Sequence, residues 1–267
     1  MSYSEIVADR TLDRIPVLVP EDLLLLEQIV WRLRGRIVEE PLQGAEAELL
    51  LVPNGRAIIT ISSLINNYHR KRFSIAHELG HLQMHREEMK ICSREDIAEV
   101  KRTVERDLEQ EANVFASCFL MPERFVRSYF TQDDSPSMTP IQMVSEMFQV
   151  SLTASACRNI DFSSEPIAIV YSREGKIQWF KATPDFFDVG VFVNVGEIVG
   201  VNTSAGRFFR GLSAPDGWRS SYAADWLRTG GFRRGAQIKE WSINMVNYES
   251  VLSLLWVDEE INDDDYF

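Results

Sequence analysis

The amino-acid sequence predicts an α+β fold, in which helices and a small antiparallel sheet come first, a helix pair follows, and the C-terminal part is β-rich. Three observations predict it. Apolar residues recur at helical spacing over 73–85 and over 109–120. Two apolar runs flank Pro-Asn-Gly at 53–55, which is typical of a β-hairpin. After residue 165 the apolar runs become strand-like, and most of the tryptophans lie there.

Local signals predict the elements of the first half in order. Pro20 is typical of the first turn of a helix, and Pro122 interrupts a helical pattern and can begin the next helix. From the N-terminus, the expected elements are a poorly structured leader (1–19), a helix (20–33), the hairpin (47–62), a polar loop (66–72), and helices at 73–85, 95–120 and 123–130.

The second half is expected to begin with helices and continue with strands. Its expected elements are a loop (131–138), two short helices (139–149 and 151–159), a hairpin (167–180), two last strands (237–243 and 250–257) and a solvated acidic tail (258–267). The expected domains are therefore residues 1–130, a helix-turn-helix-like pair at 131–162, and a β-rich domain with a regulatory or sensory role at 163–267.

Composition narrows the class of protein. The chain has 267 residues, 45% of them hydrophobic, and a formal net charge of -12, which repels polyanions and argues against a nucleic-acid partner. The three cysteines are far apart and form no CxxC pair, so we expect reduced thiols and a cytoplasmic location. The N-terminus lacks an apolar signal core, and we expect no membrane segment.

The chemistry of the chain is indicated by the pattern HExxH at 77–81. His77 and His81 are four residues apart, so on a helix they share a face about 6 Å apart along the axis and can bind one zinc ion. Glu78 leans off that face, where it can take a proton from a water molecule beside the metal. Histidines at this spacing can also be plain surface or core residues, but the apolar surroundings favour the metal.

A catalytic zinc usually takes a third protein ligand. The HxxGxxH continuation is absent, because Gln83 follows Leu82. His85 lies too far along the helix to share the ion with both other histidines, so it is either a neighbour in the cleft or an ordinary helix residue. The better candidate is a carboxylate of the next helix: we favour Glu109 over Glu111, which faces the other way and is expected to be solvated.

Three blocks of the sequence resemble the ImmA/IrrE-type metallopeptidases. They are RKRFSIAHELGHLQMH at 70–85, EQEANVFASCFLMP at 109–122, and MVSEMFQVSLTASACRNI at 143–160, in the order and spacing of that family. The resemblance implies a helical zincin-like core, a Zn²⁺ ion on His77, His81 and Glu109, Glu78 as general base, and Asn113 supporting a ligand. It also implies an intracellular regulatory protease of stress or mobile-element genes whose protein substrate is commonly a helix-turn-helix repressor.

Two other functions stay open. The helix pair could belong to a transcription regulator that binds DNA or protein without proteolysis, but only Glu146 and Arg158 are charged within 141–160. The basic runs at 69–72 and 232–234 would then be the contact sites. The metal could also serve the fold alone, although Glu78 argues against that role. For an active peptidase, the strand at 56–62 is the expected partner of an extended substrate.

Overall fold

The computed structural model describes residues 2–257, except residue 54 and the segments 87–97, 132–134, 189–190, 214–215 and 230–235. These residues form an α+β protein, which confirms the predicted class. The chain divides into two compact units: Met1–Ser128 with Met143–Ala154, and Tyr129–Gln142 with Ser155–Phe267. The acidic tail, the basic run at 232–234 and Cys92 lie outside the described residues.

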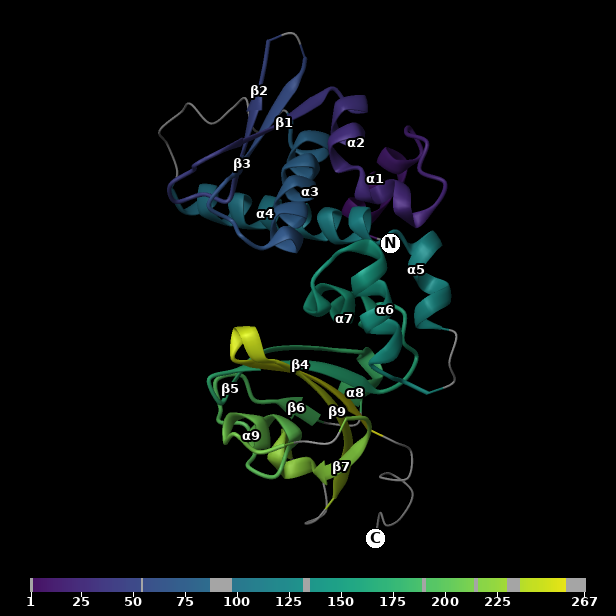
Figure 1. Ribbon diagram of the computed structural model, residues 1–267, viewed down its shortest axis with the longest axis vertical. Coiled ribbons are helices and arrows are strands. Elements are labelled where there is room, and N and C mark those ends of the chain that lie inside the picture. The colour runs from purple at the N-terminus through teal and green to yellow at the C-terminus, as the bar shows by residue number, and fades with distance from the viewer. Residues whose placement is uncertain are drawn as a thin grey trace. The chain divides into compact units, whose positions relative to one another are not determined.

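The N-terminal unit combines helices with a three-stranded sheet (Figure 1). Its elements are α1 (Tyr3–Leu12), η1 (Pro20–Leu24), α2 (Leu26–Arg32), β1 (Gly35–Glu40), β2 (Ala47–Leu51), β3 (Ala57–Ser62), α3 (Tyr68–Met84) and α4 (Ala98–Leu120). Three further helices hold residues of both units: α5 (Glu123–Phe130), α6 (Thr139–Phe148) and α7 (Leu152–Ile160).

The expectation of an unstructured leader was wrong, because residues 3–12 form helix α1. Ser2 and Glu5 build a capping box, in which the Ser2 hydroxyl accepts from the Glu5 N–H and the Glu5 carboxylate accepts from the Ser2 N–H. Ala8 and Leu12 are fully buried, and α1 packs against α4. Tertiary packing therefore stabilises a helix whose own sequence is only weakly amphipathic.

The sheet of this unit has the order β1-β3-β2. The predicted hairpin is confirmed, since β2 and β3 pair antiparallel with Leu49 opposite Ile59. Strand β1 was not predicted and pairs with β3 in parallel, with Ile37 opposite Ile59. Because β3 is central, both its edges are occupied, so the expectation that this strand pairs with substrate was wrong. Among the strands that the structure describes, β2 pairs only with β3 and forms one edge of this sheet.

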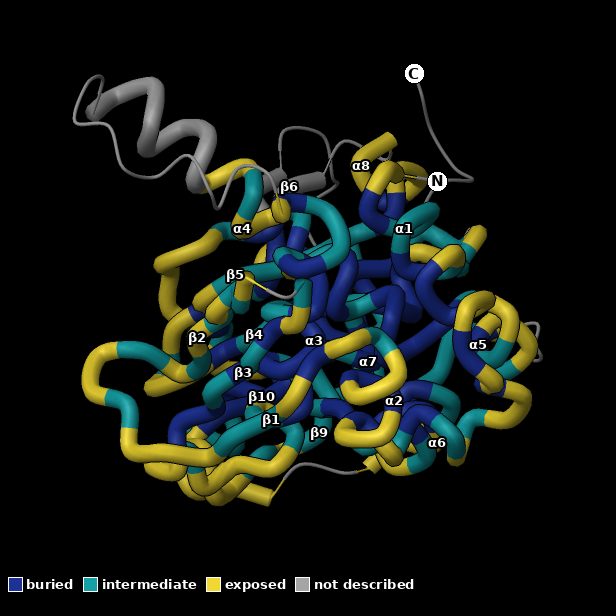
Figure 2. Tube along the Cα trace, turned by 90° about the horizontal axis from the view of Figure 1, so that it is seen from above, coloured by how far each residue is buried: buried dark blue, intermediate teal, exposed yellow. Residues whose placement is uncertain are grey.

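Helix α3 begins earlier than predicted, at Tyr68, because the Asn67 side chain caps it by accepting from the Arg70 N–H at 3.0 Å. The basic run at 69–72 is therefore the first turn of a helix rather than a loop. Arg72 is 2% exposed and donates to the carbonyls of Leu23 at 3.0 Å and Phe148 at 3.3 Å. Figure 2 shows α3 among the buried parts of the trace.

The C-terminal unit is built on an antiparallel sheet of order β5-β4-β10-β9-β7. The predicted hairpin at 167–180 and the two predicted last strands are confirmed. The remaining elements are β4 (Ile167–Arg173), β5 (Lys176–Ala182), α8 (Pro184–Asp188), β6 (Val191–Val193), α9 (Ser204–Phe209), β7 (Arg219–Tyr222), η3 (Ala223–Asp225), β8 (Leu227–Thr229), β9 (Gln237–Met245), η4 (Val246–Tyr248) and β10 (Ser250–Trp256).

A carboxylate lies at the centre of this second unit. Glu240 of β9 is completely buried. Its Oε1 accepts from the Ser204 N–H at 2.6 Å and lies 3.4 Å from Arg219 Nε. Its Oε2 accepts from the Ser221 hydroxyl at 3.1 Å and the Trp226 indole N–H at 2.5 Å. One side chain therefore joins α9, β7 and the residue after η3.

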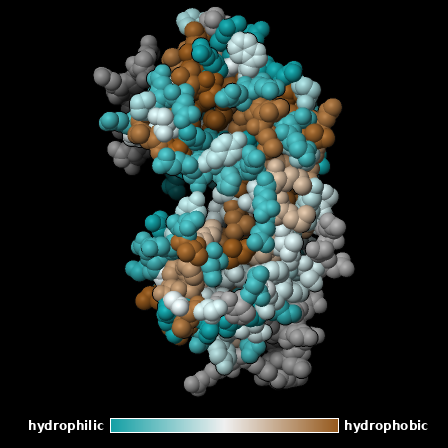
Figure 3. All heavy atoms as spheres, viewed as in Figure 1, coloured by the Kyte–Doolittle hydropathy of each residue, from teal (hydrophilic) through white to brown (hydrophobic). Residues whose placement is uncertain are grey.

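The surface carries both hydrophilic and apolar side chains, as the face in Figure 3 shows. Trp31, Leu50 and Leu64 are among the large apolar residues that are more than half exposed, at 65%, 60% and 64%. Within the described residues, no helix combines the length and apolar character needed to cross a bilayer.

Candidate metal centre

Helix α3 presents two imidazole rings on one face. The Nε2 atoms of His77 and His81 lie 3.1 Å apart, and their ring centroids lie 4.7 Å apart. Both side chains are mostly buried, with 15% and 13% of their surface exposed. The spacing of four residues on a helix therefore directs two ring nitrogens at one point.

The third group comes from α4. Glu109 Oε2 lies 3.1 Å from His77 Nε2, and Glu109 Oε1 lies 3.2 Å from His81 Nε2. The ligand atoms of the three residues all lie within 4.8 Å of one another. The structure thus brings together the three residues that we expected to hold a metal, from two helices that pack against each other.

These side chains fit a divalent metal ion. Two imidazoles and one carboxylate are a donor set of catalytic metal sites, which leave a further position for water or substrate. Burial, followed by the neighbouring His77, lowers the pKa of His81 to about 4. The His81 ring is therefore neutral at physiological pH, and a neutral ring nitrogen is the form that binds a metal.

Glu78 follows His77 on α3 and is partly buried. Burial raises the pKa of this carboxyl to about 7, and the negative charges of Glu109 and Glu48 add to the effect. A pKa near neutrality suits a general base, because the group can both accept and release a proton. A cation held by Glu109 and the two histidines would favour the ionised form of Glu78.

The outer ring nitrogens of His77 and His81 also have hydrogen-bond partners. His77 Nδ1 lies 3.0 Å from Asn113 Oδ1, the residue expected to support a ligand. His81 Nδ1 lies 3.0 Å from His85 Nδ1, and His85 Nε2 lies 2.8 Å from Glu111 Oε2. His85 is therefore a neighbour in the site, and the expectation that Glu111 is merely solvated was wrong. The sequence signal that indicates His85 as part of the site is its position four residues after His81, the same spacing as that between His77 and His81.

A glycine sets the distance between the two helices at this site. A Cβ atom added to Gly80 would lie 3.0 Å from the Phe115 ring and 3.3 Å from the Cα of Ala112. These separations are tighter than most real Cβ contacts. Gly80 lies beside His81, so the close approach holds α4, and with it Glu109, near the two histidines.

We expect the ionised Glu78 carboxylate to destabilise the protein when no metal is bound. When a carboxyl has a higher pKa in the folded than in the unfolded chain, the folded protein loses stability as pH rises. For Glu78 this loss falls between pH values of about 4.5 and about 7. One pKa unit corresponds to about 1.4 kcal/mol, so Glu78→Gln should stabilise the metal-free protein by about 1–3 kcal/mol at pH 8. Urea unfolding in the presence of a chelator measures this difference.

The gain from Glu78→Gln should disappear below pH 4.5, where the carboxyl is protonated in both states. Asp107→Asn, which removes a charge from an exposed position of α4, is the control and should give no comparable gain at pH 8. An equal gain in both variants would show that general charge repulsion, rather than burial of Glu78, is responsible.

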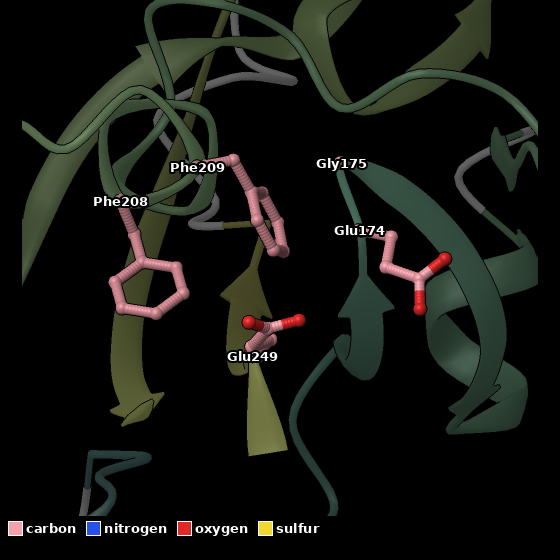
Figure 4. Close-up of a pocket in the computed structure, with 5 residues that line it drawn as sticks. All are labelled: Glu174, Gly175, Phe208, Phe209 and Glu249. Atoms are coloured by element: carbon pink, nitrogen blue, oxygen red, sulfur yellow. The ribbon is translucent and has the colours of Figure 1, made fainter. Parts of the chain in front are cut away.

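A hollow in the C-terminal unit is lined by residues other than those of the candidate metal centre. Its volume is about 380 Å³, and it is lined by Glu174, Gly175, Phe208, Phe209 and Glu249. Figure 4 shows the Glu249 carboxylate near the Phe209 ring, whereas the Glu174 side chain extends from the turn between β4 and β5. None of these lining residues is a histidine or cysteine, so the candidate metal centre remains the site on α3 and α4.

Comparisons with known proteins find a family and a solved structure to which the chain is similar. Residues 32–158 match a peptidase family described as the IrrE N-terminal-like domain. The chain is also similar to a solved structure described as a Mycobacterium tuberculosis transcriptional regulator, with a TM-score of 0.56 and 15% identity over 96% of this chain and 77% of that chain. This identity shows a shared fold alone. None of the curated proteins compared with the chain matches it.

Proposed function

Because residues 32–158 belong to the family of IrrE N-terminal-like domains, we propose that the protein is a zinc-dependent endopeptidase with a regulatory role. One observation carries the proposal: His77, His81 and Glu109 converge within 4.8 Å, beside Glu78. In this proposal the first three residues hold Zn²⁺ and Glu78 is the general base. Two imidazoles and a carboxylate are the ligands of known zinc peptidases.

Each residue of the site has a distinct task. Zinc, when bound, supplies a Lewis acid that polarises the scissile carbonyl. The Glu78 carboxylate accepts a proton from the attacking water and delivers it to the leaving nitrogen. Asn113 Oδ1 holds the Nδ1 proton of His77, which keeps Nε2 free to bind the ion.

The edge strand β2 is suited to position an extended peptide. One edge of β2 pairs with β3, and the strand lies at the border of the sheet. Strand β2 contacts α3, and the charge of its Glu48 is one of those that raise the pKa of Glu78, so this strand lies near the proposed general base. An extended substrate that adds to β2 would gain backbone hydrogen bonds beside the catalytic residues.

We infer from the family resemblance that the substrate is a regulatory protein, with a helix-turn-helix repressor as the leading class. The β-rich residues 163–267 would then form a regulatory domain, joined to the peptidase domain of residues 1–130 by the helix pair at 131–162. A reducing, cytoplasmic location is part of this proposal, because the three cysteines of the chain are far apart in sequence and form no CxxC pair.

A DNA-binding regulator is the alternative, and the described charges argue against it. Arg70 pairs with Glu46 at 2.7 Å, and Lys71 pairs with Glu39 at 2.5 Å. Arg158 of α7 is buried, with 4% of its side chain exposed, and pairs with Asp161 at 3.2 Å. Contacts to phosphate need several exposed basic side chains, and these three are engaged within the protein.

Elemental analysis and peptide cleavage test the proposal together. The purified wild-type chain should hold about one zinc ion, and His81→Ala should lose most of it, because two ligands rarely retain a catalytic zinc. The zinc-loaded wild type should cut peptides in a library derived from a whole proteome, and a chelator should stop the cleavage. Wild-type protein that binds no zinc when zinc is supplied would overturn the peptidase and favour the regulator.

A further inference from the structure

Three side chains form a hydrogen-bonded chain that leads away from the candidate metal centre. His81 Nδ1 lies 3.0 Å from His85 Nδ1, and His85 Nε2 lies 2.8 Å from Glu111 Oε2. His85 is 2% exposed, whereas 43% of the Glu111 side chain is exposed. The chain therefore starts at a ligand ring, passes through a buried ring and ends at a carboxylate that contacts solvent.

Metal binding by His81 determines which atom donates and which accepts in each of these two hydrogen bonds. When His81 binds a metal through Nε2, its proton lies on Nδ1, which can only donate. His85 Nδ1 must then accept, so the His85 proton lies on Nε2 and is donated to Glu111. In this arrangement each of the two contacts has one donor and one acceptor.

The two ligand histidines are thus supported differently. His77 Nδ1 contacts the neutral amide oxygen of Asn113 directly, at 3.0 Å. His81 reaches a carboxylate of the same helix, α4, but only through the His85 ring. His85 is the C-terminal capping residue of α3, and its backbone N–H donates to the His81 carbonyl at 2.9 Å, which holds it in place.

We infer that His85 and Glu111 are positioning residues, which fix the tautomer and the ring orientation of His81 for metal binding. This inference rests on the proposed function, because it requires His81 to be a metal ligand. Neither residue belongs to the ligand set of His77, His81 and Glu109. Hydrogen-bond partners of ligand histidines commonly contribute to metal affinity, by about 10–100-fold.

The first test is the tautomer of each ring in the zinc-loaded full chain. A long-range ¹H–¹⁵N spectrum of protein with ¹⁵N-labelled histidine should show His81 protonated at Nδ1 and His85 protonated at Nε2. Glu111→Ala should shift the ¹⁵N resonance of His85 Nε2, because that N–H loses its acceptor, while the proton on His81 Nδ1 still requires His85 Nδ1 to accept. A His85 ring protonated at Nδ1 in the wild type would overturn the inference.

The second test is zinc affinity by chelator competition. His85→Phe keeps an aromatic ring but removes both nitrogens, and it should weaken zinc binding by about 10–100-fold. Glu111→Gln should have a smaller effect, since the amide oxygen can still accept from His85. Asp107→Asn removes a charge from an exposed position on the same helix and should leave affinity unchanged. Unfolding of each metal-free variant checks that the fold is retained.

The outcomes separate this inference from the proposed function. Normal zinc binding by the wild type with unchanged affinity in folded His85→Phe and Glu111→Gln would overturn the positioning role alone. A wild-type protein without zinc would overturn both. If His85→Phe does not fold, Glu111→Gln and the tautomer spectrum of the wild type decide the question.

Discussion

Replacing Glu78 with glutamine should abolish peptide hydrolysis while the metal stays bound. Glutamine keeps the size of the side chain, but its amide cannot accept a proton from the attacking water. A positioned general base contributes about 10²–10⁴-fold to a rate, which corresponds to about 3–5 kcal/mol of transition-state stabilisation. The measurement is kcat/KM for a cleaved library peptide, beside the zinc content of the same preparation.

The control for this experiment is His77→Ala, which should lose both metal and activity. The contrast matters because loss of cleavage alone does not distinguish a missing base from a missing ion. Wild-type rates in zinc-loaded Glu78→Gln would show that Glu78 is not the base. Zinc loss in that variant would instead give Glu78 a role in building the site.

Replacing Glu240 with alanine should destabilise the C-terminal unit by about 3–5 kcal/mol, the usual cost of breaking a buried, hydrogen-bonded ion pair. The variant would leave the Ser204 N–H, the Ser221 hydroxyl and the Trp226 indole N–H without their acceptor. A buried donor without a partner costs about 1–3 kcal/mol. Loss of the Glu240 carboxylate is therefore expected to weaken the C-terminal unit strongly.

Hydrogen exchange of the β9 and β10 amides is the suitable measurement, because it reports the stability of this sheet even if the two units unfold separately. Glu249→Ala, at an exposed carboxylate of the same unit, is the matched control and should leave protection unchanged. Equal protection in Glu240→Ala and the wild type would show that the surrounding donors find other partners.

Much of the metal centre was predictable because it depends on local geometry. The spacing of His77 and His81 on a helix decides that they meet, and the faces of the next helix favour Glu109 over Glu111 as the third group. The contact of Glu111 with His85 was not predictable. It depends on how α4 packs against α3, and that information is not contained in either segment alone.

Non-local packing also explains the elements that the sequence did not predict. Strand β1 is largely polar and pairs in parallel with β3, which does not follow it through a short turn. The sequence around β1 therefore contains no hairpin signal that would predict it. Helix α1 has too weak a hydrophobic pattern to stand out and is stabilised by its contact with α4. Glu240 looks like a solvent-facing acid of a strand, because its donors come from residues 14 to 36 positions away in sequence.

The close approach of α3 and α4 at Gly80 has a consequence for the three residues of the candidate metal centre. A Cβ atom at position 80 would lie 3.0 Å from the Phe115 ring and 3.3 Å from the Cα of Ala112, so a larger residue would require these neighbours to shift. The packing of the two helices therefore decides how closely Glu109 lies to His77 and His81. In the proposed peptidase, a larger residue at position 80 would move these groups apart and weaken metal binding, although it would replace none of them.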